Sequence, residues 1–198
     1  MNNLLERRFA ARYPEMLLNQ AGPRSNVFGF ECLDGWADLI EGLLRLLKRY
    51  SDVNRQEIRI SQAKEKFGQL RIYSSGGDEI VDRAIDIVEL VSGGICECCG
   101  RPGRNSVFEG WMQTRCASHF GRPISDPIEP AGCDEEYANV FAGTLALLLG
   151  FFKSEAVHWV QRECRGLGWE KPAELLATTR GCKEVYTLLR RLELGVGI

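Results

Sequence analysis

Four residues, Cys96, Cys99, Cys116 and His119, constrain this chain more than any other feature of its sequence. They form a C-x2-C pair and a C-x2-H pair with a 16-residue spacer between them. Thiolate and imidazole ligands in such short-spaced pairs are typical of tetrahedral zinc, and the spacer is long enough to bring the second pair to the same ion. Four protein ligands leave no open position for water or substrate. The pattern therefore predicts a structural Zn2+ site in a binding module and not a metalloenzyme.

The other cysteines leave part of this assignment open. Cys98 lies between the first two predicted ligands and could replace either of them, and Cys133 is a further candidate beyond a proline-rich stretch. The chain shows no N-terminal segment with the basic, apolar and small-residue pattern of a secretory leader. We therefore expect a cytoplasmic protein with one metal site and several buried thiols, not a secreted disulfide scaffold.

Charge and hydropathy argue against two classes of partner. The 198 residues carry 25 Lys and Arg against 27 Asp and Glu, so the net charge of −2 gives no general reason to expect a nucleic-acid partner. The longest apolar run, residues 140–152, is shorter than the roughly 18–20 residues of a membrane span. It predicts a buried helix in a chain of one large or two small domains, with no membrane partner.

Hydrophobic periodicity predicts a zinc-containing α+β domain over residues 1–120. A helix should follow Asp34, a favourable N-cap, because apolar residues then recur at helical spacing as far as Leu47. Asp78 should cap a second helix, which the glycines from Gly93 onward end directly before the metal ligands.

A small antiparallel sheet should lie between these two helices. Polar and apolar residues alternate around positions 58–60 and 70–72, which predicts two strands joined by a longer connection, residues 61–69. This hairpin carries a basic patch near two aromatic residues: Lys64, Lys66, Arg71, Phe67 and Tyr73. Such a patch can bind nucleic acid by stacking and phosphate contacts. The overall charge instead favours a solvated hairpin face.

An all-helical domain is predicted over residues 134–198, after a proline-rich linker at 121–133. Asp134 should cap its first helix, which ends near Phe152. Three shorter helices should follow: residues 154–164, a turn opened by Lys171-Pro172, and residues 180–193. The fold class is therefore α+β, with the sheet in the first domain only.

The order of residues in the C-terminal part is similar to that of a known family. The residues that carry the likeness are Ser154 to Trp159, Leu167-Gly168, Lys171-Pro172 to Leu176, Gly181, and Leu188 to Val196. They resemble the toxin-binding domain of Xre/MbcA/ParS-type bacterial antitoxins. The resemblance implies a non-enzymatic protein that binds a cognate toxin, often an NAD-consuming enzyme in this family.

The same resemblance implies which residues contact the toxin. The C-terminal helices dock, and the last residues of the chain approach the entrance of the toxin's active site and occlude it. Here these residues are Arg190, Arg191, Glu193, Gly195 and Val196. Adjacent arginines suit an interface, although the charge pattern alone would favour a solvated helix end. A homo-oligomer is compatible with both interpretations.

The N-terminal part is similar to uncharacterised phage and prophage proteins. The residues that carry this likeness are Phe30 to Trp36, Lys64 to Tyr73, and the C-x2-C-G-x-P-G and C-x2-H segments. Trp111, five residues before Cys116, should pack in the core or cover one side of the metal. Two alternative functions follow: a regulator that binds nucleic acid through its zinc module and basic hairpin, and a phage protein that interferes with host defence.

Overall fold

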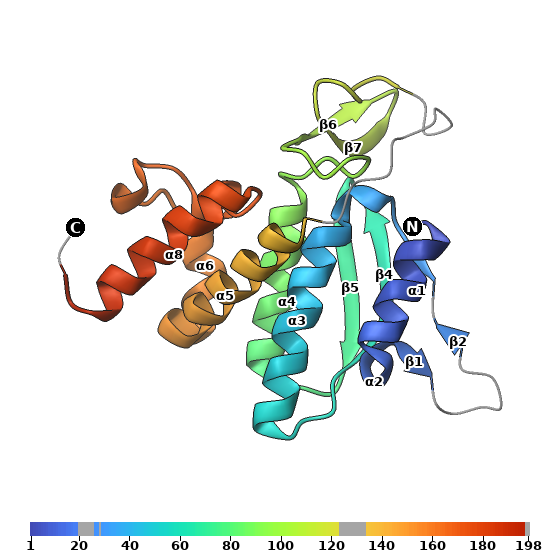
Figure 1. Ribbon diagram of the computed structural model, residues 1–198. Coiled ribbons are helices and arrows are strands. Elements are labelled where there is room, and N and C mark those ends of the chain that lie inside the picture. Colours follow the sequence, from blue (N-terminus) through green and yellow to red (C-terminus); the bar gives the residue numbers. More distant parts are fainter. Residues whose placement is uncertain (20–25, 28, 123–133, 197–198) are drawn as a thin grey trace.

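The computed structural model describes residues 1–19, 26–27, 29–122 and 134–196 of the chain. It confirms the α+β fold, with small sheets in the N-terminal half and helices through the C-terminal half (Figure 1). The predicted linker at 121–133, and Cys133 with it, lies almost entirely outside the described residues. The division into two domains therefore stays a prediction.

The chain begins with several short elements and then one long helix. They are α1 (Asn3–Arg12), α2 (Pro14–Leu17), β1 (Leu18–Asn19), β2 (Asn26–Val27), β3 (Phe30–Glu31), the 3-10 turn η1 (Asp34–Trp36) and α3 (Ala37–Asn54). The prediction that Asp34 caps α3 was wrong. Its carboxylate instead accepts hydrogen bonds from the backbone N–H of Asn2, at 2.8 Å, and from the Asn2 side chain, at 2.7 Å. Asp34 therefore anchors the N-terminus of the chain, and η1 leads into the helix.

The central sheet is a tight hairpin of β4 (Arg59–Lys66) and β5 (Gln69–Ser75), with β3 parallel to β4 on its other side. The two strands were predicted, but the long connection between them was wrong. Lys66 pairs directly with Gln69, so only Phe67 and Gly68 form the loop. Both have positive φ, at 55° and 69°, as a two-residue hairpin turn of this hand requires.

Helix α4 (Glu79–Ser92) follows the hairpin and begins as predicted, because Asp78 accepts hydrogen bonds from the N–H groups of Ile80 and Val81. The buried residues of the sheet, such as Ala63, Leu70 and Ile72, lie on its helix-covered face. Figure 1 shows α1 and α3 on the near side of β4 and β5. Beyond α4, β6 (Arg104–Phe108) and β7 (Trp111–Arg115) form a separate antiparallel hairpin.

The C-terminal half is helical. Its elements are α5 (Glu135–Phe152), η2 (Lys153–Glu155), α6 (Ala156–Val160), η3 (Arg165–Leu167), α7 (Pro172–Leu175) and α8 (Thr179–Glu193). Asp134 caps α5 by accepting from the N–H of Tyr137 at 2.9 Å, as predicted. The predicted helix over 154–164 is shorter than expected, because Cys164 leaves the helix and bridges to Glu170.

One continuous group of buried apolar side chains runs from Phe9 in α1 to Leu189 in α8. Helix α5 is central to it, since it contacts α3 on one side and α8 on the other (Figure 1). In the described part of the chain one stretch, Glu135–Val160, is long and apolar enough to cross a membrane by length and composition alone. The core helix of a soluble protein meets the same criterion. The packing of α5 between two helices accounts for its apolar composition.

Candidate functional site

The four predicted metal ligands come together at the base of the β6–β7 hairpin. One ligand atom from each of Cys96, Cys99, Cys116 and His119 lies within 4.8 Å of all the others. The two sulfurs of Cys99 and Cys116 are 3.8 Å apart, and His119 Nδ1 is 3.2 Å from Cys116 Sγ and 3.6 Å from Cys96 Sγ. Tetrahedral zinc with Zn–S bonds of about 2.3 Å places its sulfurs about 3.8 Å apart. The geometry therefore fits a zinc ion.

Backbone hydrogen bonds hold each pair of ligands in place. On the first side, the Cys96 N–H donates to the Arg101 carbonyl at 2.8 Å, and the Gly100 N–H donates to the Cys96 carbonyl at 2.9 Å. Gly100 has φ of 74°, which a residue with a side chain rarely adopts. On the second side, the His119 N–H donates to the Cys116 carbonyl at 3.0 Å. Both turns point their ligand atoms toward the same point.

The metal-ligand loop is attached to the rest of the molecule through η1. The Gly35 N–H donates to the Glu97 carbonyl at 2.8 Å, and Trp36 Nε1 donates to the Ile95 carbonyl at 3.0 Å. A Cβ at Gly35 would lie 2.1 Å from the Cys96 carbonyl oxygen, so only glycine fits there. The loop therefore rests on the entrance to α3.

Cys98 belongs to a different set of contacts. It is buried, it is absent from the four-residue group, and its sulfur accepts a hydrogen bond from Arg115. Arg115 also pairs with Glu97 at 2.8 Å, and both side chains are buried. These contacts give Cys98 and Arg115 a packing role beside the ligands. The assignment of zinc ligands stays a prediction, and Cys133 lies outside the described residues.

Trp111 lies at the tip of this hairpin and is 80% exposed, so the prediction that it packs in the core was wrong. The reason is its position directly after the Glu109–Gly110 turn, opposite Phe108 and away from the metal ligands. Neither core packing nor cover for the metal explains it.

All five residues predicted to contact a toxin lie at the exposed end of α8. Arg190, Arg191, Glu193, Gly195 and Val196 are each solvent-exposed. Arg190 pairs with Glu193, one turn further along the helix. The helix end is therefore accessible to another macromolecule.

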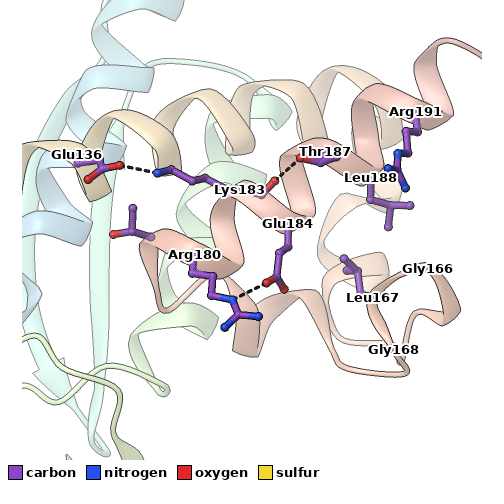
Figure 2. A pocket seen from close by; sticks show the side chains of 11 residues that line it. Glu136, Gly166, Leu167, Gly168, Arg180, Lys183, Glu184, Thr187, Leu188 and Arg191 are labelled. Atoms are coloured by element: carbon purple, nitrogen blue, oxygen red, sulfur yellow. Dashed lines mark hydrogen bonds and ion pairs between the residues drawn. The ribbon is translucent and has the colours of Figure 1, made fainter.

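A groove of about 850 Å³ lies along α8 beside this end (Figure 2). Its apolar part is formed by Leu167 and by Leu188, which is 4% exposed. The polar residues along it include two ion pairs, Arg180 with Glu184 at 2.8 Å and Lys183 with Glu136 at 2.5 Å. Of the predicted contact residues, only Arg191 lines the groove.

Sequence reasoning missed the polar side of this groove, although the signal was present. Arg180, Glu184, Thr187 and Arg191 follow one another at spacings of three or four residues. This is the period of a helix face, and a polar stripe beside the buried residues Val185, Leu188 and Leu189 marks the surface that α8 presents. The Leu167 side could not be found in the same way, because it comes from the separate turn η3.

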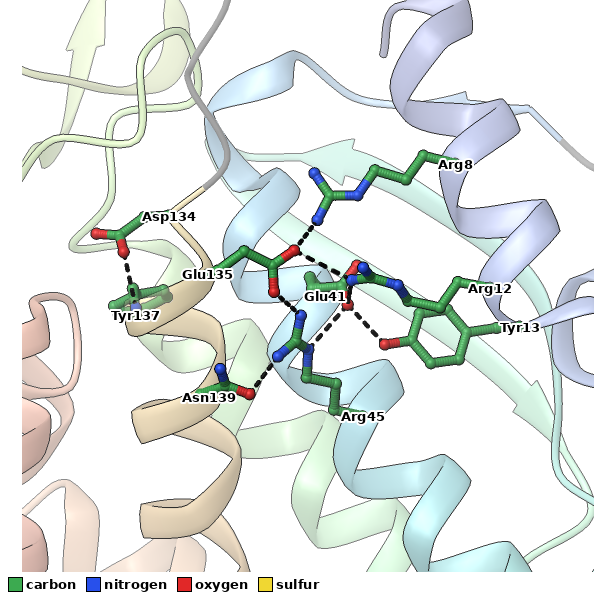
Figure 3. A network of polar contacts seen from close by, with 9 residues as sticks. All are labelled: Arg8, Arg12, Tyr13, Glu41, Arg45, Asp134, Glu135, Tyr137 and Asn139. Atoms are coloured by element: carbon green, nitrogen blue, oxygen red, sulfur yellow. Dashed lines mark hydrogen bonds and ion pairs between the residues drawn. The ribbon is translucent and has the colours of Figure 1, made fainter.

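A polar network fixes the start of α5 against the N-terminal helices (Figure 3). Oε1 of Glu41, a residue only 1% exposed, accepts from Arg12 at 2.6 Å, from the Tyr13 hydroxyl at 2.6 Å and from Arg45 Nε at 2.9 Å. Glu135 in α5 pairs with Arg12 at 3.2 Å and also with Arg45. The hydrogen bond from Arg45 lowers the pKa of Glu135 to about 2. The start of α5 is thus tied to α1 and α3.

Comparison with known proteins bears on the C-terminal half. No curated protein matches the chain. No solved structure matches it either. Residues 145–195, about a quarter of the chain, match the family described as the antitoxin Xre/MbcA/ParS C-terminal toxin-binding domain. The predicted resemblance of this region is confirmed, and the match supports an antitoxin-type role in general.

Proposed function

We propose that this protein is an antitoxin that binds a cognate toxin with α8 and the residues after it, and so blocks the toxin's active site. The observation that carries the proposal is the match of residues 145–195 to a toxin-binding domain. The accessible end of α8 supports it. An NAD-consuming enzyme is the partner class that the resemblance implies, and in this role the chain itself needs no catalytic residue.

The chemistry of the helix end suits a steric plug. Leu194 is 70% exposed and Val196 is 53% exposed, so two apolar side chains extend into solvent beyond the last turn. Full burial of such a side chain contributes about 1.5–3 kcal/mol. Arg190 and Arg191 flank them with donors suited to carboxylates or phosphates. Two exposed apolar side chains flanked by two arginines suit an active-site entrance that is lined by acidic groups or by the phosphates of a nucleotide.

We infer that zinc, held by Cys96, Cys99, Cys116 and His119, has a structural role in this function. When bound, the ion would cross-link two turns that are far apart in the sequence. The loop between them packs beside α7, since Pro102, Gly103, Ala173 and Ala177 all border one depression of about 460 Å³. The loop between the zinc ligands would therefore support α7, and through it α8, without contacting the toxin.

Co-expression with the product of the neighbouring gene tests the proposal. The full-length chain should co-purify with that product and restore growth of cells that express it. A chain that lacks residues 190–198 should fold, as judged by circular dichroism, but should neither bind nor restore growth. Full rescue by the truncated chain would exclude occlusion by the tail.

Point variants separate docking from general charge effects. Arg191→Glu reverses a charge at the groove and should weaken toxin binding. Arg7→Glu reverses an exposed charge on α1 and is the matched control, which should bind normally. If the purified toxin consumes NAD, its hydrolysis of NAD should stop when the wild-type protein is added in equimolar amount. An equal loss of binding in both variants would point to nonspecific attraction instead of a docking site.

A further inference from the structure

The face of the central sheet that is turned away from the helices has an unusual composition. Strand alternation places Ala63, Leu70 and Ile72 on the covered side. The opposite side carries the partly exposed or exposed residues of the same strands: Gln62, Lys64, Lys66, Gln69, Arg71 and Tyr73. This open face combines basic side chains with an aromatic residue, Tyr73, that is 46% exposed.

Each lysine on this face lies over an aromatic ring. The ammonium of Lys64 is 5.3 Å from the centre of the Tyr73 ring, and that of Lys66 is 5.4 Å from the centre of the Phe67 ring. Within the described part of the chain neither ammonium has a carboxylate at ion-pairing distance, whereas Lys48 pairs with Asp52 at 2.6 Å. These two cations are therefore available to an external anion. A lysine stem is flexible enough to leave the ring for a nearby phosphate.

Phe67 supplies an independent observation. It occupies the first central position of the hairpin turn with φ of 55°, and the residue is 61% exposed. A bulky residue at positive φ is an outlier, because asparagine or glycine adopts this conformation with less strain. Folding therefore does not account for a phenylalanine here. A strained and exposed aromatic residue points to a function that needs the ring.

We propose that this open sheet face binds single-stranded nucleic acid. Bases would stack on Tyr73 and Phe67, and Lys64 and Lys66 would move from the rings to the phosphates between them. The four steps along the strand from Gln62 to Lys66 span about 13 Å. The two aromatic–lysine pairs can therefore contact one strand of several nucleotides, as in other stacking platforms.

Basic residues also lie on the β6–β7 hairpin, next to this open face. Asn105 Nδ2 donates to the Phe67 carbonyl at 3.0 Å, which joins the two hairpins at their contact. Arg104, the residue before it, is exposed and borders the same depression as Gln69. Three negative groups adjoin these residues: Glu31 beside Lys64, Glu89 paired with Arg71 at 3.6 Å, and Glu174, which borders the same depression as Arg104. Among the described residues that form no ion pair here, the balance is still positive, since Lys64, Lys66 and Arg104 outnumber Glu31 and Glu174.

Fluorescence anisotropy with labelled oligothymidylate and oligouridylate of about 15 nucleotides tests the proposal on the full chain. At low salt the anisotropy should rise with protein concentration, and a duplex of equal length should compete poorly. Raising salt from about 50 to 200 mM should weaken binding steeply. A Lys64→Ala, Lys66→Ala double variant should bind weakly and show a shallower dependence on salt. The toxin is absent, so the result is independent of the antitoxin role.

Two variants distinguish stacking from a merely structural effect. Phe67→Asn should raise the melting temperature, because it relieves the turn, yet weaken binding by about fivefold to a hundredfold. Tyr73→Ala should weaken binding similarly, while Tyr186→Ala removes a tyrosine of like exposure (41%) on α8 and should have no effect. An oligonucleotide that fails to bind at low salt overturns the proposal. So does equal affinity for the wild type, the double lysine variant and Phe67→Asn.

Discussion

Removal of the Glu41 carboxylate should destabilise the fold far more than the loss of one surface charge. Three donors converge on its Oε1 atom: the guanidinium groups of Arg12 and Arg45 and the hydroxyl of Tyr13 (Figure 3). Its other oxygen, Oε2, is buried and makes no hydrogen bond within the described residues. The carboxylate therefore compensates two cations and one buried hydroxyl at a single point.

The expected magnitude follows from the exposure of each partner. Truncation of one member of a buried ion pair costs about 3–5 kcal/mol, and a buried hydroxyl left without a partner costs about 1–3 kcal/mol. The first figure must be reduced here, because Arg12 is 41% exposed and both arginines also reach Glu135. We expect about 3 kcal/mol for Glu41→Ala and about 2 kcal/mol for Glu41→Gln, which keeps an acceptor. In a chain of this length 3 kcal/mol lowers the melting temperature by about 6–12 °C.

Urea denaturation followed by tryptophan fluorescence measures these differences at constant m-value. Glu15→Ala is the matched control, because Glu15 is 46% exposed and, among the described residues, forms an ion pair only with Lys48 at the surface. It should change the free energy of unfolding by less than about 0.5 kcal/mol. The reasoning would be refuted if Glu41→Ala unfolded within about 1 kcal/mol of the wild type.

Acid should remove this stabilisation. Burial by itself would raise the pKa of Glu41, but hydrogen bonds from Tyr13, Arg12 and Arg45 outweigh burial and hold the pKa below its ordinary value of 4.5. A carboxyl whose folded pKa is depressed stabilises the fold above the unfolded pKa and loses this contribution as the pH falls through the folded pKa. The difference between wild type and Glu41→Gln should therefore be full near neutral pH and should shrink below about pH 4.

Three further predictions concern other parts of the molecule. Cys99→Ser, or chelation of the wild type, should release zinc, as measured by atomic emission, and should lower the melting temperature. The reason is that structural zinc contributes directly to the free energy of folding. An unchanged melting temperature would contradict the zinc site. Gly181→Ala should destabilise by about 1–3 kcal/mol, since its Cβ would lie 2.1 Å from the Leu175 carbonyl oxygen. Gly143→Ala in α5, where a Cβ meets nothing within 4 Å, should instead stabilise by up to about 1 kcal/mol, so a loss of stability in both would refute the steric argument. Trp111→Ala should leave the free energy of unfolding within about 0.5 kcal/mol, because that side chain is exposed, and a larger loss in thermal melts would argue for core packing.

The features that the sequence predicted correctly are those that depend on neighbouring residues. The clustering of the two pairs around Cys96 and Cys116 follows from spacing, while their role as zinc ligands stays a prediction. The caps at Asp78 and Asp134 follow from residue type. Gly181, part of the predicted resemblance, proves to be a point of close contact between α7 and α8. In each case the physical cause acts over a few residues, so the sequence pattern records it.

The features that were missed depend on distant or atypical contacts. Asp34 was predicted to cap α3, but both of its carboxylate oxygens accept hydrogen bonds from Asn2, 32 residues away. The β4–β5 turn was missed because Phe67 stands where a turn residue is expected. The apolar side of the α8 groove needs Leu167, which only the tertiary fold brings there. No local pattern in the sequence signals these arrangements.

Helix α5 limits where this chain can be recombined with another chain that carries the matched segment. The family match begins at Leu145, ten residues after Glu135, the first residue of α5. The preceding turns carry Phe141, whose ring would lie 2.8 Å from a Cβ at Gly42, so α3 and α5 fit each other closely. A chimera cut at the edge of the matched segment would keep Phe141 with Gly42 but would join the first ten residues of α5 to a foreign second half of the helix. A cut before α5 would carry Phe141 into another chain, where any residue larger than Gly42 would clash with its ring. Recombination that preserves folding must therefore carry α5 whole, together with a small residue opposite it, which couples the segment matched to the toxin-binding domain to the N-terminal half.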